Sequence, residues 1–422
     1  MCMATVRFWA KGWIEAIYLK PTFHFTYVGF EWVRPWGHFW MYVHFAVMAV
    51  SAACIALGIK PRWFAAVFCL LFTWTELIEK AVYLNHYYLV TLLSLLLVFV
   101  PTDRAFALWP HRNAEKRQWV GRWAYVWLRA QVAVVYCFAG LAKLNSDWLL
   151  EAQPLRIWLQ SYESWPWIGP WLASVPAAYA ISWAGACFDL TIWIWLLWRK
   201  TRPMAYVVAV FFHVMIWSMF PVGMFSWIML VAVTVFFDPG WPRALLARWG
   251  VRSRWEDTGS TRIVVPFSSL CTLGIGLWLL MQCLIPLRFV WYPGHVNWTE
   301  QGFRFSWRVM LVEKTGQVEY RIQTQNPSRI FRVYPRHHLE YFQYRMLCTQ
   351  PDMVHEYALF LAHEYQRQGY GKVAVFADAF IAWNGRPSRR AIDPDVDLAQ
   401  QPRSLKSVPW IAPLKKSHCL AC

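Results

Sequence analysis

The sequence predicts a polytopic α-helical membrane bundle over residues 1–286, followed by a β-rich extramembrane domain over residues 287–422. Three observations predict this class. Of the 422 residues, 58% are hydrophobic and only 15% are charged, whereas soluble proteins carry about 25% charged residues. Apolar runs long enough to cross a bilayer recur up to residue 286. Beyond it, alternating apolar and polar residues predict a sandwich-like or jelly-roll-like domain with a few helices.

The charge balance indicates where the chain meets its surroundings. Lys and Arg number 41 against 24 Asp and Glu, a net charge of +17. In a membrane protein such an excess lies in cytoplasmic loops and near lipid headgroups, so we expect lipid rather than nucleic acid as the partner. The 31 Trp residues suit interfacial belts. A soluble enzyme and a disordered chain are both excluded.

Eight apolar segments are candidate membrane spans: 40–57, 63–82, 87–101, 119–142, 172–198, 204–219, 223–237 and 266–286. Several are shorter than the roughly 20 residues that a crossing needs, so we expect tilted, broken or re-entrant pieces. Pro221 and Gly223 divide the stretch 204–237 into two segments joined by a tight break. Residues 1–18 resemble the end of a hydrophobic helix rather than a whole one, and they lack the pattern of a signal peptide.

Basic residues cluster in the short loops 102–118, 199–202 and 243–254. The positive-inside rule predicts that loop 243–254 is cytoplasmic, which places the extramembrane domain on the outer side. Most cysteines lie in apolar runs and indicate no disulfide framework. Cys419 and Cys422 form a lone C-x-x-C pair, which is weak evidence for a metal, and we expect none.

Beyond residue 286, apolar residues alternate with polar ones at Phe303, Phe305, Trp307, Val309 and Leu311. This pattern predicts a strand, and residues 314–317 (KTGQ) are expected to turn the chain into a second strand, which makes a hairpin. Residues 337–368 are predicted to be helical. Residues 372–383 are predicted to form a strand that ends at the turn 384–385.

Two His-Glu pairs lie in the predicted helix, at residues 355–356 and 363–364. A zinc protease of the zincin type needs its histidines four residues apart, whereas these are eight apart. We therefore interpret both pairs as part of a solvated helix face.

Charged residues inside apolar segments are candidates for function. Glu76 and Lys80, four residues apart, are expected to pair along one helix face near its end, with Glu79 beside them. His86 follows Asn85 at the start of the next apolar run. The sequence leaves two interpretations of His86 open: a hydrogen-bonded structural residue and a functional residue.

A stripe of polar residues marks the segment 119–142. Arg122, Arg129, Tyr136 and Lys143 are spaced by sevens, so they share one helix face and are expected to point into the bundle core. Burial among apolar side chains disfavours the ammonium form of Lys143 and makes its amine available as a base. Snorkelling to the interface is the alternative for Lys143.

Asp189 and His213 are further ionisable residues within apolar segments. No metal-ligand spacing surrounds His213, so neither zinc nor haem is indicated.

Eight segments carry a family resemblance by their order and spacing: residues 84–89, 128–131, 135–148, 212–215 and 222–227 in the bundle, and residues 294–300, 305–310 and 392–398 beyond it. Together they resemble the vitamin K-dependent γ-carboxylase family, including its bacterial members. The resemblance extends from about residue 20 to about residue 414.

The resemblance implies an enzyme that oxidises reduced vitamin K, the hydroquinone, with O2 to its epoxide. The basic intermediate removes a γ-proton from a glutamate in a protein or peptide, and the carbanion captures CO2. The catalytic lysine falls on Lys143, and two histidines that assist the quinone chemistry fall on His86 and His213. The implied setting is a bacterial cell membrane.

Further site residues are expected around these three. We expect quinone contacts from Asn85, Arg129, Tyr136 and Asp189. Contacts to the glutamate substrate are expected from Trp298, Trp307 and Arg308, with Arg308 pairing with its carboxylate.

The sequence departs from the family pattern at Phe289, where a further family histidine is expected. An apolar ring cannot exchange a proton, so the enzyme is either a full carboxylase or an epoxidase that carboxylates poorly. His295 could instead supply the missing imidazole. A non-catalytic membrane scaffold with a partner-binding β domain is the competing class, but a scaffold has no need for a desolvated base. A transporter ranks last, since no inverted halves are visible.

Overall fold

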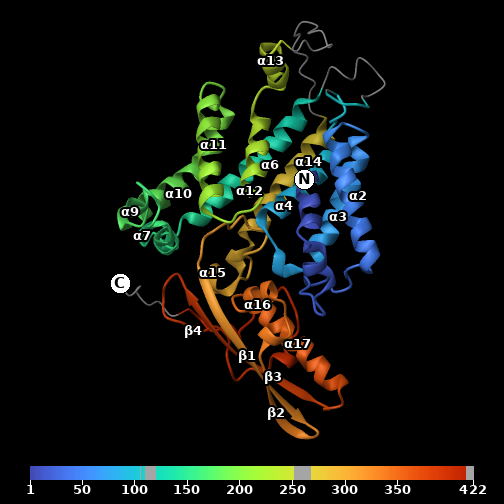
Figure 1. The fold of residues 1–422 in the computed structure, drawn as a ribbon, viewed down its shortest axis with the longest axis vertical. Helices are drawn as coiled ribbons and strands as arrows, with labels where there is room; N and C mark the ends of the chain where they lie inside the picture. Colours follow the sequence, from blue (N-terminus) through green and yellow to red (C-terminus); the bar gives the residue numbers. More distant parts are fainter. Residues whose placement is uncertain (105, 110–119, 251–267, 415–422) are drawn as a thin grey trace.

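The computed structural model describes residues 1–104, 106–109, 120–250 and 268–414. It consists of a helical bundle with an antiparallel sheet domain at one end (Figure 1). Part of the predicted basic loops and the Cys419–Cys422 pair lie outside the described residues.

The bundle contains the helices α1 (Cys2–Ala10), α2 (His38–Ala56), α3 (Pro61–Ile78), α4 (Asn85–Phe99), α6 (Arg122–Lys143), α10 (Val175–Leu197), α11 (Arg202–Met219), α12 (Phe225–Ala232), α13 (Trp241–Arg248) and α14 (Ser269–Leu287). Within the described residues, six helices are long and apolar enough to cross a membrane: α2, α3, α6, α10, α11 and α14 with the turn that follows it. The predicted multi-pass bundle is confirmed.

Some predicted spans are shorter than a membrane crossing because the helices there are short or interrupted. Helix α4 has only 15 residues. Helix α11 ends at Met219 and α12 begins at Phe225, so the predicted break at Pro221 and Gly223 is confirmed. Helix α13 is bent by 98° from the segment of α12 and η4 (Val233–Phe236).

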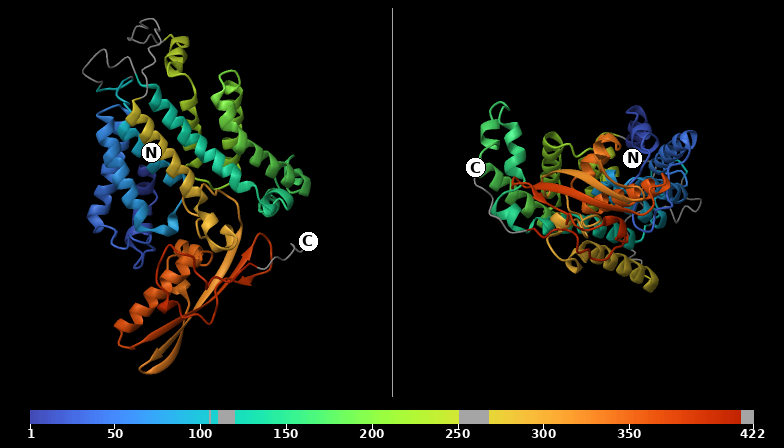
Figure 2. Two further views of the ribbon diagram at one scale, coloured as in Figure 1. Left: turned by 180° about the vertical axis from the view of Figure 1, so that it is seen from behind. Right: turned by 90° about the horizontal axis from the view of Figure 1, so that it is seen from below.

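Short elements complete the bundle: the π-helical segment η1 (Glu15–Leu19), and α7 (Ser146–Leu150), α8 (Leu155–Trp158), η3 (Leu159–Tyr162) and α9 (Gly169–Leu172) between α6 and α10. Helix α6 packs against α10, and α2, α3 and α4 pack in sequence. Seen from behind, α14 crosses the bundle beside α6 and leads into the extramembrane domain (Figure 2). Helix α13 and the extramembrane domain lie at opposite ends of the bundle (Figure 1).

The extramembrane domain is built on one antiparallel sheet, in the order β2-β1-β3-β4. Its strands are β1 (Lys314–Gln325), β2 (Ser328–Val333), β3 (Val373–Trp383) and β4 (Arg389–Arg390). Helices α16 (Tyr341–Leu347) and α17 (Pro351–Arg367) cover one face, where Tyr320 and Val375 pack with Tyr357. The β-rich domain with a few helices is confirmed, and in the described residues helices rather than a second sheet cover that face.

The predicted hairpin over residues 303–322 is wrong. Residues 303–311 form turns, in which Phe305 and Trp307 have positive φ angles of 61° and 59°. Their side chains pack as an aromatic plug against α4 rather than alternating along a strand, since Trp307 stacks on Tyr88. The predicted turn residues lie inside β1, where a Cβ at Gly316 would collide with the Cys348 carbonyl oxygen. The hairpin instead joins β1 to β2.

The expected ion pair between Glu76 and Lys80 does not form either. Helix α3 ends at Ile78 and Glu79 is extended, so Lys80 leaves the helix face. The Lys80 ammonium binds Asp352 at 2.8 Å and Glu356 at 3.0 Å, both on α17.

This pairing also corrects the interpretation of α17 as a solvated face. His355 and Glu356 are buried, whereas His363 is exposed. The His355–Glu356 pair therefore belongs to the junction between the two domains.

Candidate active site between the bundle and the extramembrane domain

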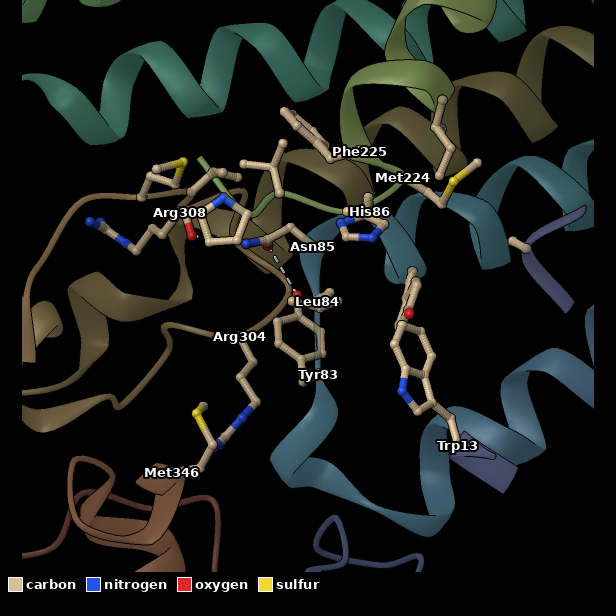
Figure 3. A pocket seen from close by; sticks show the side chains of 18 of the residues that line it. Trp13, Tyr83, Leu84, Asn85, His86, Met224, Phe225, Arg304, Arg308 and Met346 are labelled. Atoms are coloured by element: carbon tan, nitrogen blue, oxygen red, sulfur yellow. Dashed lines mark hydrogen bonds between the residues drawn. The ribbon is translucent and has the colours of Figure 1, made fainter. Parts of the chain in front are cut away.

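A cavity of about 490 Å³ lies where the bundle meets the extramembrane domain (Figure 3). Its walls come from α1 with Trp13, residues 83–87, residues 221–228, residues 303–310, and Met346 and Gln350 between the end of α16 and the start of α17. The cavity therefore receives side chains from both domains. Its volume lies in the usual range for small-molecule sites, about 300–1,000 Å³.

The start of α4 brings His86 to this cavity. Asn85 donates a hydrogen bond from Nδ2 to the Arg308 carbonyl oxygen at 2.8 Å and accepts one from the Tyr83 hydroxyl at 3.1 Å. Tyr83 in turn accepts a bond from the Phe305 N–H at 2.7 Å. These bonds tie the first turn of α4 to the aromatic plug and fix His86 on the wall (Figure 3).

His213 reaches the same region from α11. The rings of His86 and His213 lie 6.0 and 5.8 Å from the ring of Phe225, so the two histidines flank one aromatic side chain. His213 Nε2 and the Tyr136 hydroxyl share a hydrogen bond of 2.8 Å. His213 Nδ1 is buried without a hydrogen-bond partner in the described part of the chain. His86 lines the cavity, and His213 stands behind Phe225.

Lys143 is buried, with 7% of its surface exposed, at the end of α6. Its ammonium binds Asp189 of α10 at 2.6 Å and lies 5.3 Å from the centre of the Trp148 ring. Snorkelling is thereby ruled out, because the amine points into the interior. Lys143 does not belong to the described residues that line the cavity.

A line of polar groups leads from Lys143 toward the cavity. Asp189 interacts electrostatically with Tyr136 as well as with Lys143. Tyr136 is bonded to His213, and His213 contacts Phe225 on the cavity wall. The structure thus forms two pairs, Lys143 with Asp189 and Tyr136 with His213, each with one member on α6.

The other members of the predicted stripe lie elsewhere. Arg129 is half-buried and donates hydrogen bonds to the carbonyl oxygens of Val235 and Phe237, at 2.9 and 3.0 Å, at the end of η4. Arg122 is exposed at the start of α6. The expectation that all four residues face the core is wrong for Arg122, because the first turn of the helix has left the packed interior.

Arg308 lines the cavity from the extramembrane side and is 8% exposed. Its Nη1 lies 3.4 Å from Asn297 Oδ1, and its guanidinium lies 4.4 Å from the centre of the Phe289 ring. Burial lowers the pKa of Arg308 to about 10, so the group is still a cation at neutral pH. Phe289 thus packs on Arg308, and its ring shields one face of this cation.

A second cavity, of about 820 Å³, lies between the α6–α10 connection and the extramembrane domain. Trp298, His295 and Trp383 line it. Arg386 also lines it and is held by Asp147 at 2.8 Å and Glu151 at 3.0 Å. His295 therefore belongs to this cavity rather than to the one that holds His86.

The predicted tryptophans take different places. Trp298 is in α15 (Val296–Thr299) and donates from its indole N–H to the Ala412 carbonyl oxygen at 2.8 Å. Trp307 is 1% exposed and belongs to the core of the bundle. Trp298 can touch a ligand in the second cavity, whereas Trp307 stacks on Tyr88 and lines neither of these two cavities.

Sequence reasoning missed several residues of the first cavity, notably Tyr83, Phe225 and Arg304. Phe225 begins α12 directly after the predicted break, and such breaks tend to line sites. Arg304 binds Asp352 at 2.8 Å, a contact that no local pattern indicates. Among the described residues, no group of three or more His, Cys, Asp or Glu side chains could hold a metal ion.

The fold and the site define a multi-pass membrane protein in which the helical bundle and the extramembrane sheet domain share a cavity lined by His86. The family model of the HTTM domain matches residues 1–241. The model of the lumenal domain of vitamin K-dependent gamma-carboxylase matches residues 267–417. The chain belongs to this carboxylase family, and its function is vitamin K-dependent and carboxylase-like. No solved structure matches the chain.

Proposed function

We propose that this protein is a vitamin K-dependent γ-glutamyl carboxylase, a carbon–carbon lyase that couples oxidation of the hydroquinone by O2 to carboxylation of a glutamate side chain. One observation carries the proposal. His86 from the membrane bundle and Arg308 from the extramembrane domain line one cavity, and Asn85 links them through the Arg308 backbone. A quinone from the membrane and a carboxylate from outside it can therefore meet there.

The hydroquinone ring is proposed to bind beside His86 and Phe225. An imidazole can donate or accept a hydrogen bond at a quinone oxygen, and an aromatic ring offers an offset stacking surface. The Asn85 side chain is hydrogen-bonded to the Tyr83 hydroxyl and to the Arg308 carbonyl oxygen, so its proposed role is to hold His86 in place.

The proton of the hydroquinone hydroxyl is proposed to pass to the Lys143–Asp189 pair through His213 and Tyr136. In the base form the pair consists of an amine and a carboxylate. Accepting the proton produces an ammonium and a carboxylate, whose contact of 2.6 Å stabilises this form. Such transfer by a positioned side chain is general base catalysis.

The glutamate substrate is proposed to present its carboxylate to Arg308, which can hold it in two parallel hydrogen bonds. A peptide segment would extend into the second cavity beside Trp298, since Asn297 joins Arg308 to α15. We also propose that the extramembrane domain lies on the outer side of a bacterial cell membrane. The predicted cytoplasmic loop at α13 is at the opposite end of the bundle, which supports this orientation (Figure 1).

A second candidate function is an epoxidase that carboxylates poorly, and Phe289 is the observation that favours it. Its ring covers Arg308 where the family resemblance implies an additional imidazole. Measuring labelled CO2 incorporation and epoxide yield on one preparation separates the two. Equal yields support the carboxylase, whereas epoxide in large excess supports the epoxidase. Folded protein that forms neither product would support a scaffold.

A further inference from the structure

Glu76 is a carboxyl group within a membrane helix, and it takes no part in the proposed proton transfer to Lys143 and Asp189. It lies in the last turn of α3. Within the part of the chain that the structure describes, it makes no ion pair and no hydrogen bond. Carboxyl groups in membrane helices are costly and normally pair or serve proton transfer. An unpaired one therefore calls for a function.

Glu76 faces a small cavity of about 20 Å³. This volume is sufficient for one water molecule, which needs about 10–15 Å³. The other polar side chains on its wall are Thr5 of α1, Tyr18 of η1, Thr75 of α3 and Tyr87 of α4. The Thr75 hydroxyl is hydrogen-bonded to the Leu71 carbonyl oxygen and to His44, and the Thr5 hydroxyl donates to the Met1 carbonyl oxygen. The hydroxyl groups of Tyr18 and Tyr87 are therefore the candidate hydrogen-bond partners of the Glu76 carboxyl group.

Tyr87 connects this small cavity to the one that holds His86. Its side chain lines both cavities, and its ring centre lies 4.7 Å from that of His86. Tyr87 interacts electrostatically with Glu76 on one side and with Arg7 of α1 on the other. Arg7 lines the cavity that holds His86. The Tyr87 hydroxyl and the Glu76 carboxyl group therefore connect the cavity that holds His86 to helix α3.

The proposed reaction produces a proton that must leave this site. Hydroquinone and O2 yield epoxide and water without a net proton, whereas replacing the γ C–H bond by a C–CO2⁻ bond releases one H⁺. We propose that Glu76, linked through Tyr87, carries the proton that leaves the quinone cavity during carboxylation. The proposal rests on the proposed function. The proton that leaves is the one that the Lys143–Asp189 pair took from the hydroquinone, and it returns through Tyr136 and His213 to the cavity before Tyr87 and Glu76 pass it to water.

The test is Glu76→Gln, which keeps the shape of the side chain and removes its proton exchange. The rate of CO2 incorporation should fall at least about tenfold, with the KM for hydroquinone unchanged. Epoxidation without peptide should stay near the wild-type rate, because it releases no net proton. Glu76→Asp should restore most of the lost rate. Glu163→Gln, the same change at an exposed position outside the site, is the matched control.

Tyr87→Phe should lower carboxylation in the same way, and the double variant should lose no more than the slower single variant, since both act on one path. Carboxylation by Glu76→Gln within twofold of the wild type would overturn the proposal. Equal loss of carboxylation and peptide-free epoxidation would also overturn it, because that pattern indicates a structural defect.

A readout without turnover separates this proposal from the proposed function. Adding hydroquinone without O2 should change an infrared carbonyl band of a carboxylic acid, and the change should vanish in Glu76→Gln but not in Glu163→Gln. A protein that shows this band change but forms no product would overturn the proposed reaction and support Glu76 as a group coupled to the quinone site. A protein that carboxylates but lacks any Glu76-dependent band would overturn the Glu76 path alone.

Discussion

Lys143 of α6 and Asp189 of α10 meet in the interior of the bundle, with Nζ and Oδ2 2.6 Å apart. Both side chains are less than 10% exposed. A buried ion pair of this kind contributes little net stability, because desolvation offsets the attraction. We propose that the pair instead serves proton transfer, since Tyr136, on the same helix as Lys143, is bonded to His213.

Lys143→Ala should lower quinone epoxidation well beyond tenfold, or more than about 1.4 kcal/mol of activation free energy. Because this change leaves Asp189 as an unpaired buried carboxyl group, Lys143→Met combined with Asp189→Asn serves as a second test. The control is Lys20→Ala, which removes an exposed pair with Glu340. Epoxide formation by purified protein measures the effect. Activity within tenfold of the wild type in both tests would show that another group is the base.

Tyr136→Phe removes one hydroxyl from the line between Lys143 and His213. Epoxidation should slow about five- to tenfold, the rate equivalent of about one net hydrogen bond. The KM for hydroquinone should change little, since Tyr136 does not line the cavity. A raised KM with unchanged kcat would assign Tyr136 to binding instead.

Arg308→Met should weaken the binding of the glutamate substrate and leave the binding of the quinone unchanged. Losing a charged hydrogen-bond donor costs about 1.5–3 kcal/mol, which corresponds to a KM for the peptide about ten- to hundredfold higher. Peptide-free epoxidation should persist, because the Arg308 backbone, which holds Asn85, is retained. An unchanged KM for the peptide would place its carboxylate elsewhere.

Glu79 should make stability depend on pH. Burial raises the pKa of this carboxyl to about 8, against an ordinary value of 4.5. Between these values the folded protein keeps a proton that the unfolded chain releases, so this contribution is complete below about pH 4.5 and is lost as the pH rises toward 8.

Glu79→Gln cannot lose that proton. Its Tm in detergent should therefore exceed that of the wild type at pH 8, with a smaller difference at pH 5. Glu319→Gln on the sheet surface is the control. If the Tm of Glu79→Gln and that of the wild type change with pH in the same way, Glu79 is not the source of the pH dependence.

The membrane helices could be predicted because apolar length is a local property of the chain. The strand β3 and the break after α11 have equally local signals, an apolar run and a proline next to a glycine. Family resemblance brought Lys143, His86 and His213 into one hypothesis, and in the structure the two histidines flank Phe225 while Lys143 pairs with Asp189.

Other features depend on contacts far apart in the chain. The partners of Lys80 lie more than 270 residues away, so local spacing favoured Glu76 instead. Arg129 shares a stripe with Tyr136, yet its guanidinium caps carbonyl oxygens of a distant segment. The alternation at residues 303–311 resembled a strand, but the packing of Trp307 on Tyr88 decides its conformation.

We propose that the cavity shared by His86 and Arg308 couples quinone oxidation to glutamate carboxylation. The most direct test gives purified protein in detergent vitamin K hydroquinone, O2, labelled CO2 and a glutamate-containing peptide, and measures epoxide and carboxylated peptide together. We expect both products from the wild-type protein, with both lost in Lys143→Ala and only the carboxylated peptide lost in Arg308→Met. Folded wild-type protein that forms no hydroquinone-dependent epoxide would contradict it.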